Sequence, residues 1–175
     1  SIIFISIGSL AGSYNSLVGL DEEVNNKWAQ VENQLKRRAD IVPNLVNTVK
    51  GYASHEEEVF LGVAKARSGI LEANTPEEYA MAEDELNKSM QNLNIVIEKY
   101  PELKANENFI RLQDELAGTE NRLAVSRMDY NEIVKKFNSK VRRFPTNMIA
   151  NMFGFGQKEY FEISPEDAET PEVEF

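Results

Sequence analysis

A heptad repeat near the amino terminus constrains the fold more than any other feature of the sequence. Between Tyr14 and Tyr52, ten of twelve positions spaced alternately by three and four residues are apolar or aromatic, and only Asp21 and Arg38 interrupt the pattern. This spacing keeps one face of a helix apolar and is typical of coiled-coil-like packing. The sequence therefore predicts a long helix over residues 13–52, bent where Pro43 removes a backbone donor.

Start and stop signals divide the rest of the body into three further helices. Ser54 is the expected N-cap of the second helix. Thr75 and Pro76 supply an N-cap and a first helical residue for the third. Pro101 and Pro145 end the third and fourth helices. The expected ranges are residues 55–73, 76–100 and 106–144.

Four helices with short connections predict an all-α fold: an elongated antiparallel up-and-down four-helix bundle over residues 13–145. The first and fourth helices are long, and the shorter central hairpin lies beside their distal half. This leaves a stalk of two helices, which cover each other poorly, so we expect the stalk to be able to form a homo-oligomer. The exposed seam would contain Trp28, Val31 and Leu35.

The two ends of the chain differ sharply in charge. Residues 1–12 carry no charge and are fewer than the roughly 20 that a membrane-spanning helix needs. They fit the remnant of a membrane anchor, or alternatively a short strand or buried helical turn. Residues 159–175 hold seven acidic residues and no basic one. We expect this tail to be disordered.

A basic cluster followed by an apolar segment lies between the bundle and the tail. Such a segment, over residues 146–158 and the preceding turn, is suited to a lipid interface. Alternatively, the basic side chains serve the dipole of the fourth helix and the apolar ones cap the core. The candidate membrane-interface residues are Lys140, Arg142, Arg143, Met148, Met152, Phe153 and Phe155.

A second candidate site is a polar layer around Arg38, which occupies a seam position. A buried cation needs a partner, and Asp114, Glu115 or Glu120 is expected to provide it. The layer binds a partner or switches conformation, or alternatively it is a buried ion pair that fixes the register of the helices. Its candidate residues are Arg38, Asp40, Asn44, Asn121 and Arg122. Acidic runs such as residues 56–58 and 83–85 are interpreted as solvated faces.

Composition excludes several kinds of site. A net charge of −10 argues against nucleic acid as the main partner. The chain has no Cys and one His, which removes thiolate and His-rich metal sites. His55-Glu56 begins like a zinc-protease motif, but Val59 stands where the second His is required. We therefore expect no cofactor, no metal and no catalytic residues.

The last residues of the tail suggest one kind of protein partner. Val173 and Phe175, followed by a free carboxylate, suit strand addition into a PDZ-type groove, which bacterial quality-control proteases carry. The alternative is an acidic tail in contact only with solvent.

Three stretches of the sequence resemble the LemA family of bacterial membrane-anchored helical proteins. They read WAQVENQLKRRADIVPNLVNTVKGYASHE, YPELKANENFIRLQDELAGTENRLAVSRMDYN and FNSKVRRFPTNMIANMFGF, and with YNSLVGLDEEV they cover nearly all of residues 14–161 in order. The resemblance implies a single-pass protein of the bacterial cell membrane, with an N-terminal transmembrane anchor and a bundle that faces the cytoplasm. Because the family has no established enzymatic activity, the resemblance implies no catalytic residues for this chain.

Two classes of function follow. The first is a membrane-anchored, non-catalytic scaffold that presents a protein-interaction surface at the cell envelope. The second is a ligand-binding or enzymatic bundle with a polar pocket near Arg38 and Asn44. A pocket with several convergent polar groups would distinguish the second from the first.

Overall fold

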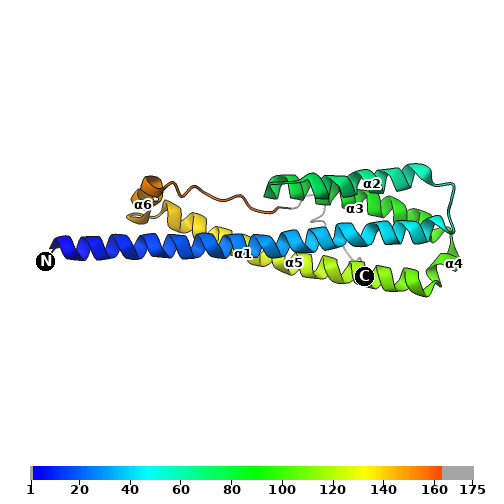
Figure 1. The fold of residues 1–175 in the computed structure, drawn as a ribbon, viewed down its shortest axis with the longest axis horizontal. Coiled ribbons are helices and arrows are strands. Elements are labelled where there is room, and N and C mark those ends of the chain that lie inside the picture. The colour runs from blue at the N-terminus through cyan, green and yellow to red at the C-terminus, as the bar shows by residue number, and fades with distance from the viewer. Residues whose placement is uncertain (1, 163–175) are drawn as a thin grey trace, which may run out of the picture. The chain divides into compact units, whose positions relative to one another are not determined.

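The computed structural model describes the backbone of residues 2–162 and the side chains of residues 10–162. This part of the chain is helical, with no strand (Figure 1), so the all-α class is confirmed. The helices are α1 (Ile2–Lys50), α2 (Glu57–Glu72), α3 (Pro76–Glu98), α4 (Pro101–Lys104), α5 (Glu107–Arg142) and α6 (Thr146–Phe153).

The helix boundaries follow the sequence signals at some ends and not at others. At the start of α3, the Thr75 hydroxyl oxygen accepts a hydrogen bond from the Glu78 amide at 3.2 Å, as the predicted N-cap requires. The predicted cap at Ser54 is wrong. It lies too far upstream, because α2 follows Glu56 and has no side-chain cap. Helix α1 runs uninterrupted through Pro43 and already begins at Ile2, so residues 2–12 are helix and not strand.

The described residues form two compact units. Unit 1 contains residues 2–32 and 124–160, and unit 2 contains residues 33–123 together with 161 and 162. Helices α1 and α5 each contribute residues to both units.

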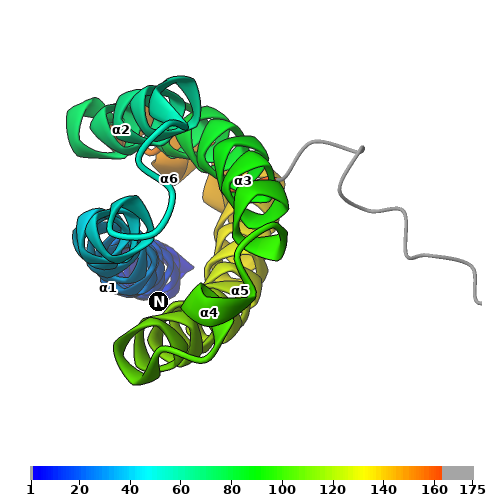
Figure 2. The same cartoon turned by 90° about the vertical axis from the view of Figure 1, so that its right-hand side faces the viewer.

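In unit 2, α2 and α3 form an antiparallel hairpin and lie side by side (Figures 1 and 2). The Ser89 hydroxyl donates to the carbonyl of Gly62 at 3.4 Å. Further along the same pair, a Cβ added to Gly69 would lie 3.4 Å from the Cβ of Ala82. Because Ala82 has a small side chain and Gly69 has none, the two helices can approach each other closely at this crossing.

The remaining helices of unit 2 complete an apolar core. Hydrogen bonds join Arg122 to Gln34 at 3.3 Å and Asn108 to Thr48 at 3.2 Å, so α1 and α5 run antiparallel there. The fully buried side chains of this core are Leu35, Val42, Leu45, Val49, Val63, Ile70, Leu86, Leu93 and Leu103. Burial of this much apolar surface is the main stabilising term for such a unit.

Unit 1 also pairs α1 with α5 in antiparallel fashion. Lys27 forms an ion pair with Asp129 at 3.1 Å, and the Lys140 ammonium donates to the Ser16 hydroxyl. The prediction of two helices alone is wrong here, because α6 and the segment 154–160 also cover the pair. Val31 in unit 1 and Leu35 in unit 2 are both fully buried within the chain, so the predicted seam is not free for self-association.

The segment after α6 begins with a left-handed turn. Gly154 has a φ of 77°, and the amide of Phe155 donates to the carbonyl of Ala150 at 2.9 Å, which closes the helix. The predicted start of a disordered tail at Glu159 lies too early, because Phe161 is fully buried. The remainder of the predicted tail, from residue 163, lies outside the described residues.

Candidate functional site

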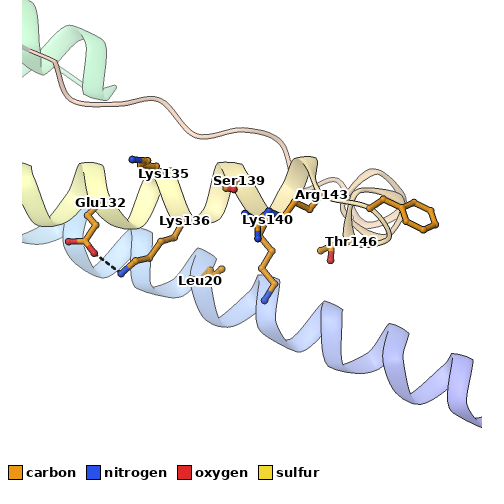
Figure 3. Close-up of a pocket in the computed structure, with 9 residues that line it drawn as sticks. Leu20, Glu132, Lys135, Lys136, Ser139, Lys140, Arg143 and Thr146 are labelled. Atoms are coloured by element: carbon orange, nitrogen blue, oxygen red, sulfur yellow. Dashed lines mark ion pairs between the residues drawn. The ribbon is translucent and has the colours of Figure 1, made fainter.

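The main candidate site is a cationic face of α5 in unit 1. Its polar residues recur at helical spacing, so they share one side of the helix, while Tyr130, Ile133, Phe137 and Val141 face the core. This face borders a cavity of about 710 Å³ (Figure 3). The cavity is lined by Leu20, Glu132, Lys135, Lys136, Ser139, Lys140, Arg143, Phe144 and Thr146.

The charges in this cavity are unevenly neutralised. Four cations and one carboxylate line it, which gives a formal charge of +3. Glu132 pairs with Lys136 at 2.7 Å (Figure 3), and this hydrogen bond and charge lower the pKa of Glu132 and raise that of Lys136. Lys140 is held by Ser16. Among the described residues, Lys135 and Arg143 have neither an ion pair nor a side-chain hydrogen bond, so their charges are available to a ligand.

Exposed apolar side chains follow the cationic face along the chain. Phe144 is 79% exposed and Met152 is 76% exposed, and Met148 and Phe153 are also exposed. The opposite side of α6 packs inward through buried Thr146, Ile149 and Ala150. Helix α6 is therefore amphipathic, with an apolar outer face that unit 1 leaves uncovered.

Phe155 differs from the other predicted interface residues. Its ring lies 6.0 Å from that of Tyr14 and 6.3 Å from that of Phe137, both in edge-on geometry. It is partly buried in this cluster and so serves packing within unit 1. Phe153 contacts the same Tyr14 ring at 4.6 Å but stays exposed. Lys140 and Arg142 lie in the last turn of α5, and Arg143 directly follows the helix.

The segment after α6 is fixed to the core side of α5 by backbone hydrogen bonds. The buried Asn138 side chain accepts from the Lys158 amide at 2.7 Å and donates to the Lys158 carbonyl at 2.9 Å. The Lys158 ammonium pairs with Asp21 at 2.7 Å and lies over the Phe137 ring at 5.5 Å from its centroid. This explains how Asp21 is tolerated at a seam position of the heptad.

Tyr130 is the one group in this region with a strongly shifted pKa. Its hydroxyl donates to the Glu159 carbonyl at 2.8 Å, and its ring lies 5.2 Å from that of Trp28. Burial, and secondly the charge of Glu159, raise the pKa of Tyr130 from 10.0 to about 12. Both effects disfavour the phenolate.

This shift predicts a stability loss at high pH. Because the folded pKa lies above the unfolded one, the folded state keeps a proton that the unfolded state releases, so the free energy of unfolding should fall as pH rises from 10 toward 12. Urea unfolding across this range should show a steeper fall for the native chain than for Tyr130→Phe. Equal slopes would show that Tyr130 does not hold its proton on folding.

The second candidate site, around Arg38, lies in the core of unit 2. Arg38 is 2% exposed, and its guanidinium pairs with Glu83 of α3 and, at 2.9 Å, with Glu120 of α5. The predicted pairing with Glu120 is confirmed. The partner Glu83 was missed, and its interpretation as part of a solvated face is wrong, because it is 5% exposed. Asp114 is exposed, and Glu115 pairs instead with Arg37 at 3.0 Å.

The structure does not bring the other predicted residues of this layer to Arg38. Asp40, Asn44 and Asn121 are exposed, and Arg122 is exposed on α5, where it donates to Gln34 at 3.3 Å. The layer thus consists of one cation and two carboxylates from three helices. In the part of the chain that the structure describes, no group of three or more acidic or His side chains could hold a metal ion. Val173 and Phe175 lie outside the described residues.

A sequence signal for Glu83 exists in α3. The buried positions of this helix are Tyr79, Glu83, Leu86, Met90, Leu93, Val96 and Ile97. All of them except Val96 follow alternating steps of four and three residues, beginning with a step of four from Tyr79. The sequence analysis instead interpreted residues 83–85 as a solvated face. A register that includes Met90 and Ile97 would have placed Glu83 in the core.

No helix among the described residues contains an apolar stretch sufficient to cross a bilayer.

Comparison with known proteins places this architecture in one family. The model of the LemA family matches residues 27–175. Protein LemA of Metamycoplasma hominis is 26% identical over 93% of this chain and 76% of its own length. Magnetosome protein MamQ 2 of Paramagnetospirillum magneticum is 25% identical over 91% of this chain and 68% of its own length. Magnetosome protein MamQ of Magnetospirillum gryphiswaldense is 22% identical over the same shares. The chain belongs to the LemA family.

Proposed function

We propose that this protein is a membrane-anchored, non-catalytic helical scaffold of the bacterial cell envelope. The observation that carries the proposal lies in unit 1, where a cationic cavity is followed directly by the exposed apolar face of α6. This combination is suited to the boundary between lipid headgroups and acyl chains. Residues 1–12, which have no charged side chain, would be the remnant of a single-pass anchor, with the helical units on the cytoplasmic side.

The proposed architecture of the scaffold is an antiparallel up-and-down four-helix bundle. Two observations within unit 2 support it. Helices α1 and α5 run antiparallel, and α2 and α3 form an antiparallel hairpin. Arg38 of α1 joins α3 and α5 through its two ion pairs, which ties the hairpin to the long helices.

The state of Arg38 favours a scaffold over a ligand-binding or enzymatic bundle. Both terminal nitrogens of its guanidinium are engaged by carboxylates, and the residue is almost fully buried. Asn44, the other residue of the alternative pocket, is exposed. Fixing helix register is the better-supported role for such a layer.

A surface for protein partners is supported on the outer side of α3. Met81 and Ile95 are exposed on this helix and lie about four turns apart, so they share one side. Single exposed apolar residues are common, but two on one face can anchor a partner helix. The acidic tail with Val173 and Phe175 is the second proposed contact, with a PDZ-containing protease as its partner.

Crosslinking and affinity capture from native membranes would test the scaffold proposal. The native chain would be compared with Met81→Lys/Ile95→Lys, with a chain lacking residues 163–175, and with Lys65→Glu as an exposed control on α2. We expect specific partners that are lost with the α3 variant, the tail deletion or both, and retained with the control. Recovery of the same proteins from all four chains, or of none from the native chain, would contradict a scaffold role.

A further inference from the structure

We propose that the cationic cavity of unit 1 binds the phosphate headgroup of an anionic phospholipid. The inference rests on the proposed function, since it names the lipid that the membrane-facing end would recognise. It concerns one cavity, lined by the face of α5 from Glu132 to Lys140 and by Arg143 just after the helix, and the adjacent apolar side of α6.

The charge of the cavity matches a phosphate. Lys135 and Arg143 are the two lining cations without a salt-bridge partner among the described residues. Lys135 lies on α5, and Arg143 directly follows Arg142, the last residue of that helix. Lys136 and Lys140 lie between them and point toward α1 in Figure 3. A headgroup placed in the cavity would therefore meet positive charge along its whole length.

Complementing the helix dipole does not account for this charge. The field of a helix C-terminus falls off within the last turn, where Lys140 and Arg142 are found. Lys135 and Lys136 lie well upstream of that turn, yet they line the same cavity. The row of cations thus extends further than a capping role requires.

The apolar part of the lining distinguishes a lipid from a soluble phosphate. Leu20 and Phe144 line the cavity together with the cations, and Phe144 is almost fully exposed. Beyond it, Met148, Met152 and Phe153 continue the exposed apolar surface on α6. A free phosphate would use only the cations, whereas a phospholipid carries a phosphate and acyl chains joined in one molecule. The combined lining therefore favours the lipid.

Flotation of the full chain with phospholipid vesicles would test this inference. One set of vesicles would contain phosphatidylcholine alone, and the other phosphatidylcholine with phosphatidylglycerol. We expect binding about tenfold tighter to the anionic vesicles, and a loss of most of this preference in Lys135→Glu/Arg143→Glu. The matched control is Lys65→Glu/Arg111→Glu, which makes the same charge change on exposed residues of unit 2 and should keep the preference. Far-ultraviolet circular dichroism and thermal unfolding would verify that each variant is folded.

A second variant separates the lipid from other phosphates. Phe144→Ser should weaken binding to anionic vesicles, because it removes the apolar contact while leaving every cation in place. Glycerol 3-phosphate or inorganic phosphate that displaced the vesicles at low millimolar concentration would overturn the lipid assignment in favour of a soluble ligand. An unchanged preference in Lys135→Glu/Arg143→Glu would overturn the cavity as the site.

The outcomes also separate this inference from the proposed function. Equal binding to both kinds of vesicle would contradict headgroup recognition and leave membrane attachment supported. Binding to neither would contradict both.

Discussion

Replacing Arg38 with Met should destabilise the protein by about 3–5 kcal/mol, because it leaves the buried carboxylate of Glu83 without its cation. For a chain of this size, such a loss corresponds to a fall in melting temperature of roughly 10 °C. Urea unfolding followed by circular dichroism would measure it.

Two comparisons make this prediction specific. Arg37→Met removes the neighbouring exposed ion pair with Glu115 and should cost less than about 1 kcal/mol. Arg38→Met combined with Glu83→Leu removes both buried charges and should recover most of the lost stability, since Glu120 is half exposed and can be solvated. If Arg38→Met lowered the free energy of unfolding no more than Arg37→Met does, the buried pair of Arg38 and Glu83 would not contribute more to stability than an exposed pair.

Phe137→Ala should destabilise unit 1 by about 3–5 kcal/mol, because the ring of Phe137 is fully buried and its removal leaves a cavity that the core cannot close. The ring also supports Phe155 and the ammonium of Lys158, so the segment after α6 loses two contacts at once. Hydrogen exchange measured by mass spectrometry should show faster exchange in residues 155–160, beyond the fall in global stability.

The matched variant is Phe144→Ala, seven residues further along the chain. Its side chain is almost fully exposed, so its free energy of unfolding should stay within about 0.5 kcal/mol of the native value. The same substitution at the two positions then separates a structural aromatic residue from one available for binding. Equal losses from the two variants would show that Phe144 packs in solution.

The heptad of α1 allowed much of the fold to be predicted. Seven of its ten apolar positions became buried in one long helix, whereas Tyr14 and Tyr52 at its two ends are exposed. Its two polar positions, Asp21 and Arg38, both became ion-paired. A seam position reports that a charge needs a partner, but it does not identify that partner. Glu83 was missed because it stands in an acidic run, which is typical of a solvated face, and only its pairing with Arg38 shows that it is buried.

The segment after α5 was less accessible to sequence analysis. Its apolar composition indicated an interface, but Met152 and Phe155 look alike in sequence and have different environments. The environments of Met152 and Phe155 differ because the left-handed turn at Gly154 changes the direction of the chain between them. Asn138 then binds the backbone of Lys158 and holds the following segment in place. Neither contact depends on a repeating pattern, so periodicity does not reveal it.

The continuity of α1 and α5 limits how this architecture can be modified by recombination. Compact units usually meet at flexible connections, where one can be exchanged for another. Here the transitions between residues 32 and 33 and between 123 and 124 fall inside uninterrupted helices. Excising either unit would cut two helices in mid-course and expose eight backbone groups at each new pair of ends. Separating the units at these positions is therefore expected to destabilise the helices of both.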